Sequence, residues 1–260
     1  MTIIDTGVDR RPIDENECVE QAQTFESWFG AVEGYLGDTS YGRHADTIDL
    51  TLDEARRDQL ITALCNYCVG ETAALESASG LVRLAPGPSA KVFMATQVVD
   101  EARHLEVFLH RLTELGVTDP EAEIACRANP ALFDFAQALL DLVEAGDWNA
   151  ALFAQTVVLE TTELTVLQTH AETADPVTAD ILAGVIADER RHFGFAENSL
   201  GRQLTDHPVL RPHLQRIRTQ LEPIALDVFD NALCEIEAPA EARGRLGRHY
   251  LTTIERLGLT

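Results

Sequence analysis

The sequence predicts an all-α protein built on four long helices, with additional helices at both ends. Apolar residues recur every three or four positions along most of the 260-residue chain, and no stretch alternates in the manner of a β-strand. In addition, the pentapeptide Asp-Glu-x-Arg-His occurs twice, at residues 100–104 and 188–192, each time inside a long helical pattern. The repetition indicates that the bundle consists of two related helix pairs.

The N-terminal third is predicted to hold one flanking helix and the first bundle helix. Residues 1–14 lack periodicity and predict a loose arm, whereas residues 15–36 carry apolar side chains at helical spacing. A long helix is expected from about Leu52 to Leu81. Thr51 is its candidate N-cap, with Glu54 three residues later as in a capping box.

Proline and glycine mark the remaining boundaries. Pro86-Gly87-Pro88 interrupts the helical pattern, and Asp175-Pro176 does so again further along. The bundle is therefore expected to cover about residues 52–204 of a single domain, 1–260. The other helices are predicted over Ser89–Leu115, a short stretch within Asp119–Asn129, Ala131–Ala145, Trp148–Glu172 and Val177–Leu204, with two more in Pro208–Thr260.

Composition narrows the range of partners and of cellular location. The net charge of −23 argues against nucleic acid or an anionic membrane surface as partner, and indicates a solvated exterior or a docking face for a basic reductase. No N-terminal apolar segment and no run of 18 apolar residues occurs, so a cytoplasmic protein is expected. Cys65 and Cys68 lie within an apolar helical pattern, without a second cysteine pair, and are expected to be buried thiols.

The repeated pentapeptide predicts two metal half-sites. In each copy a Glu and a His lie three residues apart, Glu101 with His104 and Glu189 with His192, so each pair shares one helix face. A buried carboxylate beside an imidazole is costly unless both groups bind something, and together they suit a hard or borderline metal ion.

The position of two further glutamates indicates that the half-sites meet. Glu71 and Glu101 lie about equally far from the turn at Gly87, roughly 22 Å along their helices, so an antiparallel hairpin brings them to the same height. Glu160 and Glu189 flank the second turn in the same way, 29 residues apart against 30 for the first pair. All four carboxylates and both imidazoles are therefore expected in one layer.

This set matches the ligands of dinuclear carboxylate bundles, in which each of two helices gives one Glu and each of two others gives Glu-x-x-His. Glu163, one turn after Glu160, is an alternative or additional ligand. The predicted metal ligands are Glu71, Glu101, His104, Glu160, Glu189 and His192.

The other residues of the pentapeptides are expected to support these ligands. Asp100 and Asp188 are candidates to accept a hydrogen bond from the second ring nitrogen of each His, and Arg103 and Arg191 to pair with those carboxylates. The six other histidines show no ligand spacing and are expected at the surface or as satisfied core residues: His44, His110, His170, His207, His213 and His249.

In order and spacing these residues resemble the ferritin-like di-iron carboxylate proteins over about residues 52–204. The Asp-Glu-x-Arg-His form is most similar to bacterial multicomponent monooxygenases, with arylamine N-oxygenases as relatives, and the 29-residue spacing also resembles aldehyde-deformylating oxygenases. In ribonucleotide reductase subunits a radical Tyr follows the first motif His by four residues. Phe108 occupies that position here, which disfavours radical storage.

The resemblance implies an enzyme, an O₂-activating non-haem di-iron monooxygenase. Such an enzyme would hydroxylate or N-oxygenate a small organic substrate through a peroxo-diiron intermediate, with electrons from a separate ferredoxin or flavin reductase. Two Fe ions are the implied cofactor, with Mn/Fe as an alternative, and a homodimer is usual for the fold. An aldehyde-deformylating enzyme, a Mn/Fe ligand-binding oxidase and a non-catalytic iron-handling protein remain open. The substrate pocket is expected near Tyr67, Phe108 and Phe193.

Overall fold

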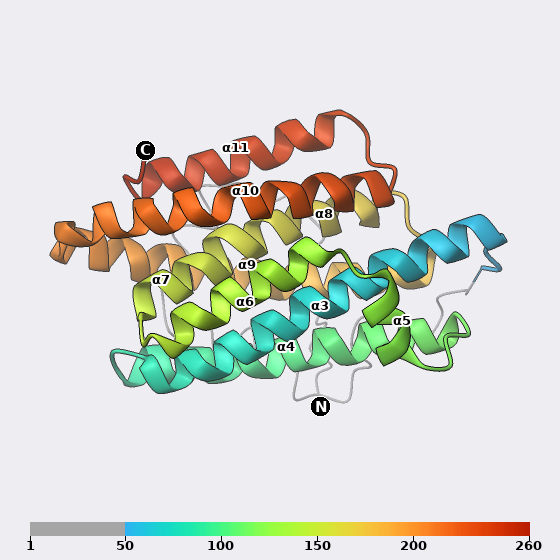
Figure 1. The fold of residues 1–260 in the computed structure, drawn as a ribbon, viewed down its shortest axis with the longest axis horizontal. Coiled ribbons are helices and arrows are strands. Elements are labelled where there is room, and N and C mark those ends of the chain that lie inside the picture. The colour runs from blue at the N-terminus through green and yellow to red at the C-terminus, as the bar shows by residue number, and fades with distance from the viewer. Residues whose placement is uncertain (1–49) are drawn as a thin grey trace, which may run out of the picture.

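The computed structural model describes residues 50–260, and within that range it contains helices and no strand (Figure 1). The all-α prediction is therefore confirmed, while the predicted helix at residues 15–36 lies outside the described residues. The elements are α3 (Glu54–Leu84), α4 (Pro88–Glu114), α5 (Pro120–Arg127), α6 (Pro130–Glu144), α7 (Trp148–Leu152), η2 (Phe153–Glu160), α8 (Thr161–Ala171), α9 (Pro176–Asp206), η3 (Pro208–Leu210), α10 (Arg211–Glu235) and α11 (Glu241–Arg256).

Helices α3 and α4 form the first antiparallel hairpin. Asp53, and not the predicted Thr51, caps α3, because its carboxylate accepts a hydrogen bond from the backbone amide of Arg56. The hairpin turns at the predicted Pro-Gly-Pro, where Pro88 occupies the first turn of α4, a position that needs no amide donor.

The second hairpin differs from the prediction in one respect. The segment expected as a single α-helix, Trp148–Glu172, contains an eight-residue π-helix, η2, between α7 and α8. Helix α9 then begins at the predicted turn, where Asp175 accepts from the amides of Val177 and Thr178. The same carboxylate accepts from the fully buried Arg111 of α4 at 3.0 Å, so it also joins the two hairpins.

The remaining helices cover the two hairpins from one side. Helix α6 packs against α3, α10 packs against α6, η2 and α8, and α11 packs against α8. Figure 1 shows α10 and α11 running along the bundle on the side away from α4. One helical stretch in the described part of the chain, Trp148–Ala171, is long and apolar enough to span a membrane, but 94% of its most apolar window is buried inside the protein.

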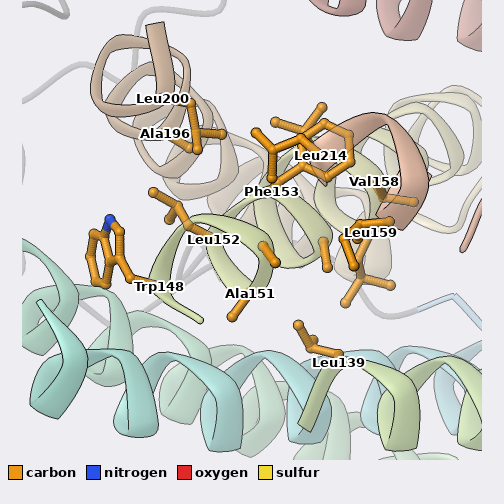
Figure 2. Close-up of a cluster of buried hydrophobic side chains, with 14 of the residues drawn as sticks. Leu139, Trp148, Ala151, Leu152, Phe153, Val158, Leu159, Ala196, Leu200 and Leu214 are labelled. Carbon is orange, nitrogen blue, oxygen red and sulfur yellow. The ribbon is translucent and has the colours of Figure 1, made fainter. Parts of the chain in front are cut away.

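The apolar core is divided into two main clusters along the bundle. One surrounds α7 and η2 and includes Phe153 and Leu200 (Figure 2). The other contains Leu64 and Phe108, towards the opposite end of the same helices. Between the two clusters, the buried residues of the four bundle helices are polar, and they form a separate layer across the bundle.

Candidate metal centre

The structure brings all six predicted ligand residues into one buried layer between the two apolar clusters. Glu71 comes from α3, Glu101 and His104 from α4, Glu160 from the end of η2, and Glu189 and His192 from α9. Each is at most 2% exposed. The equal arms of the two hairpins therefore place these side chains at one height, as the spacing predicted.

The side chains form two groups that share a carboxylate. Atoms of Glu71, Glu101, His104 and Glu189 lie within 4.8 Å of one another, and so do atoms of Glu101, Glu160 and His192. Glu189 also reaches the second group, because its Oε2 lies 3.5 Å from Nδ1 of His192. Glu101 and Glu189 thus lie between the two imidazoles, whereas Glu71 and Glu160 each belong to one end.

Both imidazoles turn Nδ1 towards the carboxylates. Nδ1 of His104 lies 3.1 Å from Glu71, 3.2 Å from Glu101 and 3.3 Å from Glu189. Nδ1 of His192 lies 3.4 Å from Glu101. Nδ1 is therefore the nitrogen that each ring would offer to a metal ion.

The two aspartates of the pentapeptides bind the other ring nitrogen, but in a crossed arrangement. Nε2 of His104 lies 3.2 Å from Asp188, and Nε2 of His192 lies 3.2 Å from Asp100. Each Asp therefore contacts the His of the other helix. When Nε2 carries the ring proton and donates a hydrogen bond to the Asp, Nδ1 is unprotonated. Its lone pair is then available to bind a metal ion.

Two arginines form ion pairs with these aspartates. Arg103 contacts Asp100 and lies 3.5 Å from Asp188, so it contacts both acids. Arg191 contacts Asp100 and donates to the Thr96 hydroxyl at 3.0 Å. Burial lowers the pKa of Arg191 to about 10. The predicted Arg–Asp pairs thus exist, and they tie α4 to α9 beside the metal layer.

Two buried glutamines, which no sequence motif marks, also belong to this layer. Nε2 of Gln97 donates to Glu160 at 2.8 Å and to Glu101 at 3.0 Å, and Nε2 of Gln155 donates to Glu160 at 3.1 Å. Gln97 precedes Glu101 by one α-helical turn and therefore lies on the same helix face. This spacing is a sequence signal by which Gln97 could have been predicted. Gln155 precedes Glu160 by five residues, and the wider turn of the π-helix brings that spacing onto one face.

The electrostatics of the layer favour a bound cation. Burial is the main cause that raises the pKa of Glu71 to about 7, and the neighbouring His104 opposes it. Burial and neighbouring carboxylates raise the pKa values of Glu160 and Glu189 well above the ordinary range. Burial, with Arg191 and His104 as smaller causes, lowers the pKa of His192. Four carboxylates crowded in a dry layer repel one another unless protons or metal ions are present.

The donor set fits two divalent ions. In the described part of the chain, one oxygen of each of the four glutamates and Nδ1 of His192 have no hydrogen-bond partner, although all are buried. Buried acceptors without partners are rare, and here they converge on one space. The charge of two divalent ions would offset the four carboxylates, and oxygen with imidazole donors suits iron or manganese.

Other residues singled out from sequence have different surroundings. Tyr67 and Phe108 are buried and pack on each other with ring centroids 5.3 Å apart, so they fill the core beside the layer, while Phe193 is only partly buried. His170 is a satisfied core residue, since its Nδ1 lies 2.8 Å from the Tyr67 hydroxyl. Cys65 and Cys68 are buried thiols, as expected.

Comparison with solved structures supports the fold. An aldehyde-deformylating oxidase from Synechococcus matches with a TM-score of 0.69 and 18% identity over 80% of this chain and 93% of that one. An R2-like ligand-binding oxidase, described with a Mn/Fe cofactor, matches with a TM-score of 0.71 and 15% identity over 91% and 93% of the two chains. At this identity the likeness establishes the ferritin-like fold alone.

Comparison of sequences identifies the family. No curated protein matches the chain. Residues 37–198, more than half of the chain, match the family described as Methane/Phenol/Alkene Hydroxylase, and this range contains both pentapeptides and all four buried glutamates. The family is one of di-iron oxygenases, in agreement with the predicted two-iron cofactor and with O₂ as co-substrate. The chain therefore belongs to the methane/phenol/alkene hydroxylase family of ferritin-like di-iron proteins.

Proposed function

We propose that this protein is a monooxygenase that uses O₂ and a dinuclear iron centre to hydroxylate or N-oxygenate a small organic substrate. The observation that carries the proposal is the buried layer in which four glutamates and two imidazole Nδ1 atoms converge between two apolar clusters. Family membership supports oxygen chemistry and a small-molecule substrate, because these are common to the family.

The proposed ligands are the six residues predicted from sequence. Glu71 and His104 would hold one ion, Glu160 and His192 the other, and Glu101 and Glu189 would contact both. When bound, two ferrous ions supply the electrons and the open coordination positions that O₂ reduction requires.

The protein's own contribution is to orient the ligands and to exclude water. Asp100 and Asp188 hold the imidazoles with Nδ1 turned inward, and the amide groups of Gln97 and Gln155 hold one oxygen of Glu160. The apolar residues on both sides of the layer keep bulk water away, which strengthens every electrostatic contact inside it. Electrons for further turnovers would come from a separate reductase.

The test is a turnover experiment with isotope-labelled oxygen. The protein is loaded with Fe(II) without air, its iron content is measured, and it is then supplied with ¹⁸O₂, a reductant and a panel of arenes, alkanes, amines and fatty aldehydes. The expected result is two irons per chain and a hydroxylated or N-oxygenated product that carries ¹⁸O.

Other products would refute the proposal and indicate a different reaction. Formate with a shortened hydrocarbon from an aldehyde would indicate deformylation. Uptake of many irons per chain without any oxidised organic product would indicate an iron-handling protein.

A further inference from the structure

Two fully buried glutamines direct their amide groups at the same oxygen of Glu160. Nε2 of Gln97 on α4 lies 2.8 Å from Oε1 of Glu160, and Nε2 of Gln155 on η2 lies 3.1 Å from that atom. Only the NH₂ end of an amide can donate to a carboxylate, and a carboxylate oxygen has two lone pairs. The two amides therefore occupy Oε1. The other oxygen, Oε2, has no hydrogen-bond partner among residues 50–260 and is the atom left for a metal ion.

Gln97 also contacts a second carboxylate of the same metal position. Its Nε2 donates to Oε1 of Glu101 at 3.0 Å, and this oxygen lies 3.4 Å from Nδ1 of His192. The other oxygen of Glu101, Oε2, lies 3.2 Å from Nδ1 of His104 and accepts no hydrogen bond within the described residues. Of the two oxygens by which Glu101 would join the ions, only the one on the His192 side is shared with an amide.

The His104 position is built differently. No side-chain amide among residues 50–260 donates to Glu71, and Oε1 of Glu71 has no hydrogen-bond partner there, so this residue can offer both oxygens to an ion. A further carboxylate, Glu163, belongs to neither ligand group but lies on this side. Its Oε1 would be 3.3 Å from a Cβ atom added to Gly70, the residue before Glu71. The two metal positions are alike in sequence and unlike in structure.

The two glutamines fit the carboxylates rather than the surrounding helices. Oε1 of Gln97 and Oε1 of Gln155 are buried without a hydrogen-bond partner in the described part of the chain. A buried acceptor without a partner is destabilising, so the contacts of the NH₂ groups are made at a cost. A strong hydrogen bond to a carboxylate oxygen competes with a metal ion for the same lone pairs and reduces the charge that the ion meets.

We propose that Gln97 and Gln155 are positioning residues that restrict Glu160 to a contact through one oxygen and thereby weaken metal binding at the His192 position. Metal ions then enter in sequence. The first occupies the His104 position, where Glu71 offers both oxygens, and the second occupies the His192 position. This inference rests on the ligand set of the proposed function and not on the reaction.

The test follows metal binding itself, with Mn(II) as the probe and without turnover. Metal-free protein is titrated with Mn(II) by calorimetry, and electron paramagnetic resonance spectra are recorded at one and at two ions per chain. The wild-type protein should bind two ions, the first about tenfold or more tightly than the second, as charge-assisted hydrogen bonds at one position imply. One ion per chain should give the spectrum of isolated Mn(II), and the second should give a spin-coupled pair. Repulsion between adjacent ions weakens the second step in any such site, so variants carry the comparison.

The informative variant removes both amide donors. In Gln97→Leu/Gln155→Leu both oxygens of Glu160 become available, so the second Mn(II) should bind about tenfold more tightly than in wild type. A purely structural role predicts the opposite, because a disturbed layer binds metal more weakly. Glu160→Gln should keep the tight step and lose the weak one, which assigns the weak step to the His192 position. Gln137→Leu is the matched control and should titrate as wild type, since Gln137 donates to Asp141 at 2.7 Å on the exposed face of α6.

Three results would overturn the inference: equal affinities for the two ions in wild type, an unchanged or lower second affinity in the double variant, or loss of the tight step in Glu160→Gln. If the double variant does not fold, Gln155→Leu replaces it, because it removes one of the two donors to Oε1 of Glu160. An unchanged or lower second affinity in that variant would equally overturn the inference. Binding of fewer than two ions by the wild type would refute the ligand set and this inference with it. Failure of the monooxygenase proposal would appear separately, as absence of ¹⁸O-labelled product.

Discussion

Removal of the metal should make the stability of this protein depend on pH in an unusual direction. Burial raises the pKa of Glu71 from an unfolded value near 4.5 to about 7. A group whose pKa is raised in the folded state contributes stability that is full below the unfolded pKa and is lost as the pH rises through the folded pKa. The metal-free protein should therefore become more stable as the pH is lowered from about 8 to about 6.5.

The expected size of the effect follows from the same shift. Over that interval Glu71 alone adds about 0.8 kcal/mol to the free energy of unfolding. Glu160, Glu163, Glu189 and Asp188 have pKa values raised in the same direction. The histidines with lowered pKa values, His170 and His192, oppose this trend, because at pH 6.5, the ordinary histidine pKa, half of each imidazole is already protonated in the unfolded chain. The comparison of wild type with Glu71→Gln cancels this contribution, since both proteins carry the same histidines.

The assay is urea unfolding of chelator-treated protein, followed by far-ultraviolet circular dichroism at the two pH values. In the Glu71→Gln variant, the free energy of unfolding should increase less between the two pH values, by the part that Glu71 contributes. The Glu76→Gln variant, which changes an exposed residue, should show the full increase. Loading with Fe(II) should remove the increase, because bound metal keeps the carboxylates ionised and competes with protons. A free energy of unfolding that is unchanged or falls between the two pH values in the metal-free protein would refute the reasoning.

Three further predictions test single features. Glu160→Gln should lose at least one iron per chain while the helix content of the circular dichroism spectrum stays near wild type, and retention of two irons would show that the ligand assignment is wrong. Gly80→Ala should destabilise the protein by about 1–3 kcal/mol, because the new methyl group would overlap Cγ1 of Val143 where α3 packs on α6, and Val143→Ala in the same chain should restore part of the loss. The lowered pKa of His170, about 4, makes the folded protein lose stability as the pH falls from about 6.5 to about 4. His170→Gln should therefore reduce that loss by about 3 kcal/mol in urea titrations, and an unchanged acid dependence would contradict this account.

The four core helices could be predicted from local chemistry. Helical periodicity, the Pro-Gly-Pro turn and the Asp175-Pro176 turn act over a few residues, so they can be read without knowledge of the fold. The spacing of Glu71, Glu101, Glu160 and Glu189 also predicted their common height, because the rise of a helix per residue is constant. The positions of the two turns and the spacing of the four glutamates together imply that the four carboxylates lie in one layer.

Other features depend on packing between helices and could not be read from the chain. The π-helix at Phe153–Glu160 has no local sequence signal, and it alone turns Gln155 towards Glu160. The crossed pairing of Asp100 with His192 depends on how α4 and α9 face each other.

The sequence by itself determined the fold class, the four bundle helices and the proposed ligand set, because helix signals and residue spacing act along one helix. Only the tertiary structure decided which Asp supports which His, which carboxylates lie between the two imidazoles, and that Glu163 lies over Gly70 without an ion-pair partner among residues 50–260. These features arise between helices, where the side chains of distant residues compete for the same buried space.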